Sequence, residues 1–345
     1  MMSYSDIIRN NCEKHSPVSW WPKFAYHCTD VTNAVSILAS GILYSRASAK
    51  HLGLMANDNA SRQVIDMTQT EATSCARFYF RPLTPTQYYN EGFKHTQLRY
   101  DNDENANMPV PVFLLFDLAK LLSIPKVKFS EQKQSGRGST LQSGEEAFSQ
   151  LNFDYIYSIG FNNINETKPY RHAEILHPNS LQIDSCINYI LCRNNVERTT
   201  LLNMLKNRNQ LAFRKYKDII KICKSDMFEH NGLYVTDCQY HDNVISVSFS
   251  DSRDKASYTR SLKQKNNVSD LKPVTVRLEL DWLNSRGVVY HNATQTQIDY
   301  ERTVNISFKG LRNFPNAKII RIQVLIEDKL MCFVEFSLET SELIK

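Results

Sequence analysis

The segment 170-YRHAEILHP-178 places one carboxylate, that of Glu174, in a short run that otherwise has the pattern of a strand. Side chains alternate along a strand, so Glu174 can face a cleft while Ala173 and Ile175 face the core. A lone acid in such a place can take up a proton or stabilise a developing positive charge. The simpler alternative is an edge strand from which Glu174 points into solvent.

Other polar residues that could bind or react lie upstream of this segment. They are His27, Thr29 and Asn33, Arg62 in the loop 58-DNASRQ-63, and Arg77 and Tyr79 in the strand 76-ARFYFRP-82. Each has an ordinary structural explanation: a partly buried histidine, a solvated arginine or an aromatic ring of the core. Their order along the chain therefore carries more information than any one of them.

Several common enzyme motifs are missing from the sequence. There is no P-loop, and the Gly-x-Gly at 136–138 has neither a strand before it nor a helix after it, as a dinucleotide fingerprint requires. There is no nucleophile elbow and no HExxH motif. The eight cysteines are dispersed without a CxxC pair, which argues against a zinc module and for reduced thiols.

Composition and charge indicate an ordinary globular chain with room for two domains, because 345 residues contain 42% hydrophobic and 22% charged side chains. No apolar run approaches the roughly 18 residues of a membrane span, and no signal peptide is evident. We therefore expect a cytoplasmic protein without a membrane partner. The net charge of +5 is concentrated in residues 193–224, where nine Lys or Arg stand against two acids. Such a stripe is either a phosphate-binding footprint or a solvated helix face.

The elements that must position these residues follow from periodicity and from chain breakers. A strand and a helix that ends at Gly41 are predicted over residues 25–46. Further strands are predicted at 76–82, at 110–118 (apolar enough to be buried on both faces), and, with a turn, at 153–161. The polar stretch 130–146 is predicted to be a long loop, and such loops are typically functional or disordered.

The pattern of predicted secondary structure changes after about residue 185. Two helices, at 195–207 and 211–224, are predicted to carry the basic stripe. From about residue 232, alternating apolar runs separated by Asn, Gly, Asp and Pro predict an all-β region with a sandwich arrangement.

Three segments in order, 26-YHCTDVTN-33, 77-RFYFRPLTPTQYYNEG-92 and 170-YRHAEIL-176, resemble the DarT family. Its members are nucleic-acid ADP-ribosyltransferases, the toxins of toxin–antitoxin pairs. The resemblance covers about residues 24–180 and is greater to the guanine-modifying branch than to the compact thymidine-modifying one. Asp30 and His172 depart from the family pattern, which often has His and Gln at these positions, and both bear on base preference.

The resemblance implies a role for each candidate residue. Glu174 and Arg62 become catalytic, with Arg77 and Arg81 as alternatives for the catalytic arginine. The residues implied to bind NAD⁺ are His27, Thr29, Asn33, Arg77 and Tyr79. The residues implied to bind the nucleic-acid substrate are Arg137, Tyr155, Tyr157, Arg171 and His172.

The fold implied is α+β: an ADP-ribosyltransferase-like mixed-sheet domain over 1–185, a basic helical connector over 186–228 and an all-β accessory domain over 229–345. The function implied is a phage-defence toxin that transfers ADP-ribose from NAD⁺, without a metal, to a base of single-stranded DNA, with guanine favoured. A macrodomain antitoxin is the implied partner. The alternatives are modification of thymine, RNA or protein, or a non-enzymatic nucleic-acid-binding module.

Overall fold

The computed structural model describes residues 2–56, 58, 70–99, 107–134, 140–160, 163–312 and 314–344. The chain forms two compact units, each assembled from separate segments. The first contains residues 1–89, 112–191 and 225–229, and the second contains residues 90–111, 192–224 and 230–345. The domains expected from the sequence are continuous ranges, so these units divide the chain differently. None of the described helices is long and apolar enough to cross a membrane.

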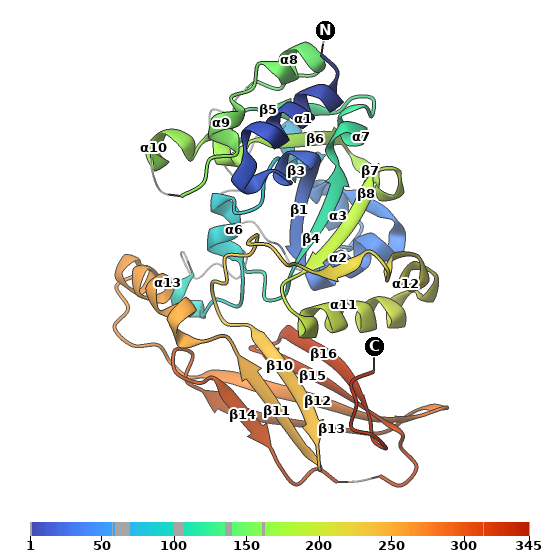
Figure 1. Cartoon of the computed structure of the whole chain (residues 1–345). Coiled ribbons are helices and arrows are strands. Elements are labelled where there is room, and N and C mark those ends of the chain that lie inside the picture. The colour runs from blue at the N-terminus through green and yellow to red at the C-terminus, as the bar shows by residue number, and fades with distance from the viewer. Residues whose placement is uncertain are drawn as a thin grey trace. The chain divides into compact units, whose positions relative to one another are not determined.

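The first unit is built on a sheet whose strands follow the order β5-β6-β3-β1-β4-β8 (Figure 1). The strand bounds are β1 Phe24–Asp30, β3 Cys75–Tyr79, β4 Pro111–Asp117, β5 Lys128–Ser130, β6 Glu174–Pro178 and β8 Ile187–Cys192. Strand β3 pairs antiparallel with both β1 and β6, and β5 pairs antiparallel with β6. In β4 the five residues Val112 to Phe116 are buried, which confirms the prediction of a strand covered on both faces.

Helix α2 (Val31–Ser40) begins and ends as local signals in the sequence predict. The Asp30 carboxylate caps its first turn by accepting a hydrogen bond from the Thr32 backbone N–H at 3.0 Å. Gly41 ends the helix at φ 70°, a left-handed conformation that costs glycine little. Strand β2 (Ile42–Tyr44) follows and pairs with β7 (Ser180–Gln182).

The remaining helices of the first unit are short. They are α1 Tyr4–Lys14, α3 Arg46–His51, α5 Thr70–Thr73, α6 Pro85–Asn90, α7 Leu118–Leu122, α8 Glu145–Ser149, α9 Phe153–Ile156 and α10 Ile164–Thr167. Helix α9 shows that the strand predicted at 153–161 is wrong. Phe153, Ile156 and Tyr157 are buried, and their spacing of three and four residues is helical.

The segment that contains Glu174 is also shorter as a strand than predicted. Tyr170–His172 forms a single 3₁₀ turn, and β6 begins at Glu174 itself. Ala173, Glu174 and Ile175 are all buried, so the carboxylate does not lie on an open face of an alternating strand. The edge-strand alternative is wrong as well, because β6 lies between β5 and β3.

The second unit starts its helical part with α11 (Asn195–Arg208) and α12 (Gln210–Tyr216). The first matches its predicted helix, but the second ends earlier than predicted, and β9 (Ile220–Ile222) follows it. Two residues of the basic stripe are engaged within the protein. Arg193 is buried, and the Arg198 Nε–H donates to the Ile220 carbonyl at 2.9 Å.

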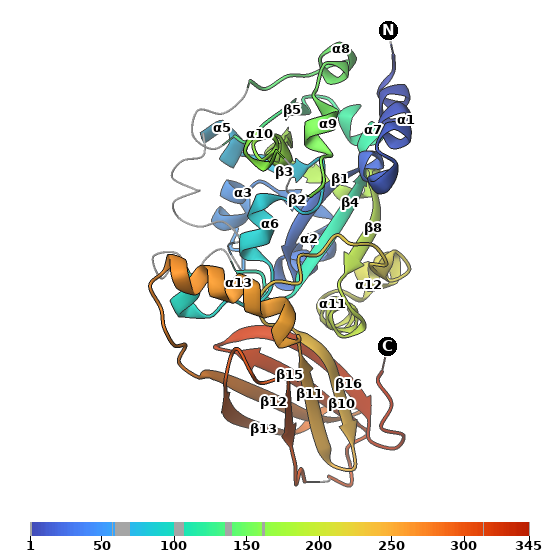
Figure 2. The same cartoon turned by 60° about the vertical axis from the view of Figure 1, so that its left-hand side comes forward.

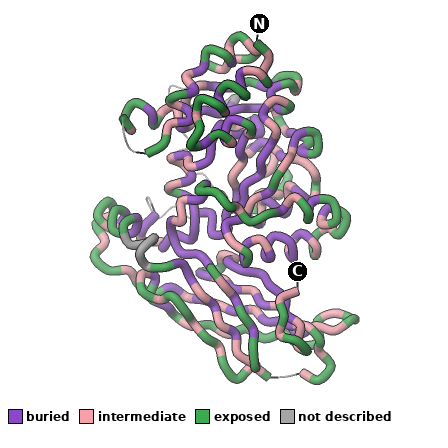
Figure 3. Tube along the Cα trace, viewed as in Figure 1, coloured by how far each residue is buried: buried purple, intermediate pink, exposed green. Residues whose placement is uncertain are grey.

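Two antiparallel sheets make up most of the second unit (Figure 2). One has the order β10-β11-β14 and the other β13-β12-β15-β16. Their bounds are β10 Val235–His241, β11 Val244–Phe249, β12 Val274–Asn284, β13 Gly287–Ile298, β14 Asn305–Phe308, β15 Ile319–Ile326 and β16 Lys329–Ser337. Alternate residues of β11, β12 and β15 are buried, as the sequence predicts for half-buried strands (Figure 3). The expectation of an all-β region is wrong at Ser252–Lys265, which is helix α13.

Two glycines allow a close crossing of the backbone within the second unit. Phe93 and Leu233 exchange two backbone hydrogen bonds, each of 2.8 Å. A Cβ on Gly92 would lie 2.0 Å from the Asn231 carbonyl oxygen, and one on Gly232 would lie 2.8 Å from the Phe93 carbonyl oxygen. Both glycines also have φ near 70°, so neither position accepts a side chain without rearrangement.

Candidate active site

Glu174 occupies the first position of β6 and lies in the middle of three strands. Its Cα is in register with Tyr79 of β3 on one side and with Ser130 of β5 on the other. Only 3% of its side chain is exposed. Burial raises the pKa of the Glu174 carboxyl, while the charge and hydrogen bonds of Arg77 and a backbone hydrogen bond from Gln134 oppose that rise.

Arg77 holds this carboxylate through a bidentate contact. Its Nε–H donates to Oε2 at 2.9 Å, and its Nη2 donates to Oε1 and Oε2 at 2.7 Å each. Burial lowers the pKa of the guanidinium, but the charge and hydrogen bonds of Glu174, together with Tyr79 and Cys75, outweigh this effect and raise the pKa overall. The Arg77 side chain keeps 27% of its surface exposed, so the pair is reachable from the arginine's side.

The arginine beside Glu174 is therefore Arg77, which the sequence analysis assigns to NAD⁺ binding and keeps as an alternative for catalysis. Arg62, its first choice, lies outside the described residues. Arg81 donates to three backbone carbonyls, those of Pro82, Ile156 and Ser158, and its side chain is buried. Its donors thus fasten the segment that follows α9.

His27 of β1 contacts the backbone of Arg77, and Thr29 lies two residues further along the same strand. The His27 Nδ1 lies 3.0 Å from the Arg77 carbonyl oxygen, and a carbonyl can only accept, so Nδ1 carries the proton and Nε2 is an acceptor. Burial lowers the pKa of His27, which favours this neutral form. Asn33 donates to the Thr29 hydroxyl at 3.3 Å and accepts from the Ala56 backbone N–H at 3.0 Å. Asn33 thereby ties α2 to the segment that follows α3.

Tyr79 is on β3, where it is in register with Glu174 of β6 on one side and with Tyr26 of β1 on the other. Burial and the nearby carboxylate raise the pKa of its hydroxyl, which shares a hydrogen bond with the Thr86 side chain. Tyr79 is therefore a neutral group next to the acid.

Positive charges gather beside His172, just before Glu174. Burial, together with the charges of Lys133, Lys168 and Arg77, lowers the pKa of His172 to about 4. The imidazole is therefore neutral near pH 7. The sequence analysis does not single out Lys133, Lys168 or Gln134. The signal that could have found two of them is their place at the start of the long polar loop, directly after β5.

The residues assigned to nucleic-acid binding are placed in different environments. Arg171 donates to the Ser158 hydroxyl at 3.1 Å and to the Gly160 carbonyl at 2.7 Å, so its donors hold a neighbouring loop. Tyr155 is partly exposed, and its ring is edge-on to that of Tyr170. Tyr157 is only 2% exposed and stacks on Phe153, so it offers no face to a base.

The last of these residues, Arg137, lies outside the described residues. No group of three or more His, Cys, Asp or Glu residues that could hold a metal ion occurs in the part of the chain that is described.

The mixed sheet of the first unit thus holds the Glu174 carboxylate at the start of β6 against the Arg77 guanidinium, and the family match identifies this domain as one of the ADP-ribosyltransferase class. The family model described as ssDNA thymidine ADP-ribosyltransferase, DarT, matches residues 26–228, which is more than half of the sequence. The chain belongs to the DarT family of NAD⁺-dependent DNA ADP-ribosyltransferases. No curated relative matches the chain.

Solved structures of DarT proteins are similar to this chain at low identity. Thermus sp. 2.9 DarT in complex with NAD⁺ is 17% identical with a TM-score of 0.46, covering 60% of this chain and 98% of that one. The same protein in complex with ADP-ribosylated ssDNA is 15% identical with a TM-score of 0.45, over 60% and 96%. Thermosipho africanus DarTG in complex with ADP-ribose is 15% identical with a TM-score of 0.44, over 64% and 54%. The family assignment rests on the sequence match.

Proposed function

We propose that this protein transfers ADP-ribose from NAD⁺ to a base of single-stranded DNA, with Glu174 as the catalytic acid–base group. The observation that carries this proposal is the bidentate Arg77–Glu174 pair, which is buried on the glutamate side and partly open on the arginine side. Family membership supports the reaction class and NAD⁺ as the co-substrate. The activity of the family on single-stranded DNA also supports a DNA strand as the acceptor.

The residues around the pair fit the charges of NAD⁺. A dinucleotide brings a negatively charged diphosphate, and Lys133 and Lys168 supply two cations close to His172, while Arg77 is engaged with Glu174. His27 and Thr29 share one face of β1, because they are two residues apart on a strand. The free Nε2 of His27 can accept a hydrogen bond from a ribose hydroxyl.

The carboxylate serves two steps of the proposed reaction. The bond between ribose C1′ and the nicotinamide nitrogen breaks with oxocarbenium character, and Glu174 can stabilise that positive charge. Nicotinamide leaves as a neutral molecule. A nitrogen of the base then bonds to C1′, and its proton passes to Glu174. Arg77 keeps the carboxylate oriented and counters the effect of burial on its pKa.

The base is the finer part of the proposal, and we propose guanine. It is supported by the segment FRPLTPTQYYNEG and by the long chain after residue 180, both of which resemble the guanine-modifying branch. Thymine is the second candidate, because the matching family model is described by that activity. The target must be reached outside a base stack, which single strands permit.

The test of the reaction uses labelled NAD⁺ and oligonucleotides that contain a single guanine or a single thymine among the other two bases. Label on the guanine oligonucleotide alone is the expected result, and label on the thymine oligonucleotide alone would replace guanine by thymine. Glu174→Gln should abolish the label, whereas Glu146→Gln, an exposed acid of α8, should not. Absence of label on either DNA, with transfer to RNA or to protein, would contradict the proposal.

We also propose that the protein is the toxin of a toxin–antitoxin pair with a role in phage defence and that a macrodomain antitoxin reverses its modification. The family assignment supports this role. Expression in bacteria should arrest growth, and Glu174→Ala should relieve the arrest at equal protein level. Co-expression of a DNA-directed ADP-ribosylglycohydrolase macrodomain should restore growth. Toxicity that persists in Glu174→Ala would favour a non-enzymatic binding module instead.

A further inference from the structure

A cavity in the second unit lies beside β13, which is an edge strand of the four-stranded sheet. Its volume is about 570 Å³, which is within the usual range of small-ligand pockets. Strands β12 and β13 of one sheet and β14 of the other contribute to it, together with the segment that follows β14. The lining residues used below are Trp282, Tyr290, Asn292, Lys309 and Arg312.

The composition of β13 is unusual for a strand that borders a core. Tyr290, Asn292 and Thr294 stand opposite residues 282, 280 and 278 of β12 and so share their face of the sheet. On β12 that face is apolar and buried, whereas on β13 it is polar and largely exposed. The other edge strand, β16, is buried along most of its length. Packing of the core therefore does not explain the polar inner face of β13.

Trp282 and Tyr290 line the cavity, and both rings pack against Phe314. Tyr290 stacks on Phe314 with ring centres 4.2 Å apart, and the Trp282 ring lies 5.0 Å from Phe314 and 5.6 Å from Tyr290. Tyr290 is 39% exposed, whereas Trp282 is 1% exposed. Within the described residues the Trp282 indole N–H makes no hydrogen bond, although it lines the cavity. An indole N–H without a protein partner beside a partly exposed aromatic ring is suited to binding a base.

Two cations stand at the rim of the same cavity. Lys309 and Arg312 are exposed, and neither forms an ion pair with a residue that the structure describes. Aromatic faces for bases and neighbouring cations for phosphates are the combination by which proteins bind single strands. Asn292 adds a side-chain amide that can pair with the edge of a base.

We propose that this cavity binds a nucleotide unit of single-stranded DNA, with the base against Tyr290 and Trp282 and its phosphate at Lys309 and Arg312. The inference extends the proposed function, and rests on it for the nature of the strand, because it gives the second unit a role in holding the same substrate. The chemistry recognised is a base with an adjacent phosphate, whether free or part of a strand.

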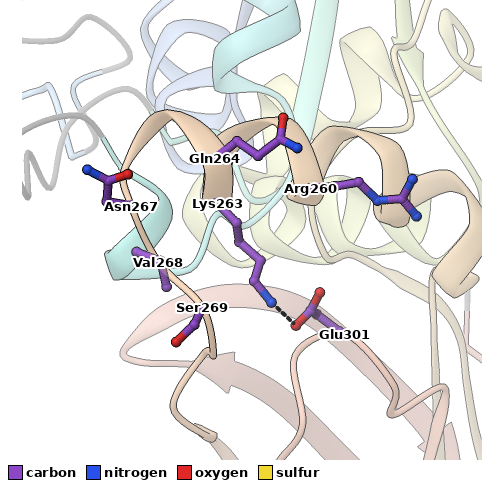
Figure 4. A pocket seen from close by; sticks show the side chains of 7 residues that line it. All are labelled: Arg260, Lys263, Gln264, Asn267, Val268, Ser269 and Glu301. Carbon is purple, nitrogen blue, oxygen red and sulfur yellow. Dashed lines mark hydrogen bonds and ion pairs between the residues drawn. The ribbon is translucent and has the colours of Figure 1, made fainter.

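A second cavity of the same unit serves as a contrast (Figure 4). Its volume is about 560 Å³, and its lining includes Arg260, Lys263 and Glu301 but no aromatic ring. Lys263 is paired with Glu301 at 3.1 Å, so part of its positive charge is already neutralised. The second cavity has no aromatic ring on which a base could stack. It also lacks two neighbouring cations like Lys309 and Arg312, which form no ion pair with a described residue.

The test measures binding of a fluorescent 12-nucleotide single strand by anisotropy, in the full chain that carries Glu174→Gln so that no transfer occurs. Tyr290→Ala should weaken binding roughly fivefold or more, and Tyr290→Phe should not, because the ring is kept. Lys309→Gln with Arg312→Gln should lower the slope of log affinity against log salt by roughly 1.4, that is, roughly 0.7 for each lost phosphate contact. Arg286→Gln, an exposed cation in the β12–β13 turn, is the matched control and should change neither quantity appreciably.

Unchanged affinity in Tyr290→Ala and an unchanged salt slope in the double variant would overturn the proposal. A mononucleotide that competes in the parent but not in Tyr290→Ala would support it and would identify the nucleotide unit as sufficient. Competition only by longer strands would also support it and would require a strand. If binding depends on Tyr290 but the wild type modifies no base, the proposed function is contradicted and this inference is not. If the wild type modifies a base but binding does not depend on Tyr290, this inference alone is contradicted.

Discussion

The Arg77–Glu174 pair of the first unit and the cluster of Arg193, Glu197 and Glu91 in the second unit both hold a guanidinium against a buried carboxylate. In the first unit Arg77 holds one carboxylate, that of Glu174, and keeps 27% of its own side chain exposed. In the second unit Arg193 donates to Glu197 at 3.2 Å and to Glu91 at 3.3 Å, and all three side chains are at most 1% exposed.

The second cluster is closed on its remaining sides. The Arg193 guanidinium lies 3.5 Å from the centre of the Tyr234 ring, and the His230 backbone N–H donates to Glu91 at 2.9 Å. Burial raises the pKa of Glu197 to about 7, with Arg193 opposing and Glu91 adding to the rise. The same pair of chemical groups is thus structural where no face is reachable and suited to catalysis where the arginine meets solvent. Exposure of one partner separates the two roles.

The largest effect is expected when each cluster loses a carboxylate. Glu174→Gln should reduce base modification by roughly 10³-fold, within the range for removal of a catalytic acid–base group, without a comparable loss of folded protein. Glu197→Gln should leave the rate per folded molecule within roughly twofold. Single-turnover transfer to an oligonucleotide measures both variants. Equal loss of activity in the two variants would remove the distinction.

Removal of the arginine should destabilise the second cluster more than the first. Arg193→Met leaves Glu91 and Glu197 buried without a positive partner, so the free energy of unfolding should fall by about 3–5 kcal/mol. Arg77→Met should cost less, because the pair in the first unit is open on the arginine's side. Urea denaturation followed by circular dichroism gives both values. A greater loss of unfolding free energy in Arg77→Met than in Arg193→Met would contradict a mainly structural role for the Arg193 cluster.

The pH dependence of stability should report on Glu197. Its pKa in the folded chain, about 7, lies above the ordinary 4.5, so the folded state favours the protonated form. The contribution of Glu197 to the free energy of unfolding is therefore fully present below about pH 4.5 and is lost as the pH rises through about 7. It amounts to at most roughly 3 kcal/mol. Unfolding measured between pH 4.5 and 8 should show this loss in the wild type and a flatter profile in Glu197→Gln.

The pH dependence of the reaction should report on Glu174. A base must be deprotonated, so the rate should rise with pH through the raised pKa of Glu174. Arg77 lowers that pKa, so Arg77→Gln should move the acidic limb to higher pH, whatever its residual rate. Arg9→Gln, at an exposed pair with Asp6, should not move it. An acidic limb at the same pH in Arg77→Gln would show that another group titrates.

Local signals made much of the first unit predictable. Helix α2 is bounded by a capping Asp30 and by Gly41, and β4 is recognised by an unbroken apolar run. Both depend on neighbours within a few residues. Helices α9 and α13 lie where local patterns predict a strand and an all-β region, because a few apolar residues at helical spacing are hard to tell from a strand.

The partner of Glu174 was beyond local reasoning, because Arg77 is 97 residues away in the chain. Pairing of β3 with β6 brings Arg77 and Glu174 together. The register of two strands cannot be predicted from the sequence of either strand alone. The same holds for Arg193, which counts as one more cation of a basic stripe until its burial between Glu91 and Glu197 is seen.

The order of the YHCT, FYFRP and YRHAE segments is enough to indicate the class of this protein, because that order can be recognised without knowledge of how the segments pack. The same segments indicate Glu174 and His27 as site residues. The arginine that meets Glu174, the burial of Arg193 and the polar face of β13 become visible only in the folded chain. These features depend on strand register and burial, which arise from contacts between residues far apart in the chain.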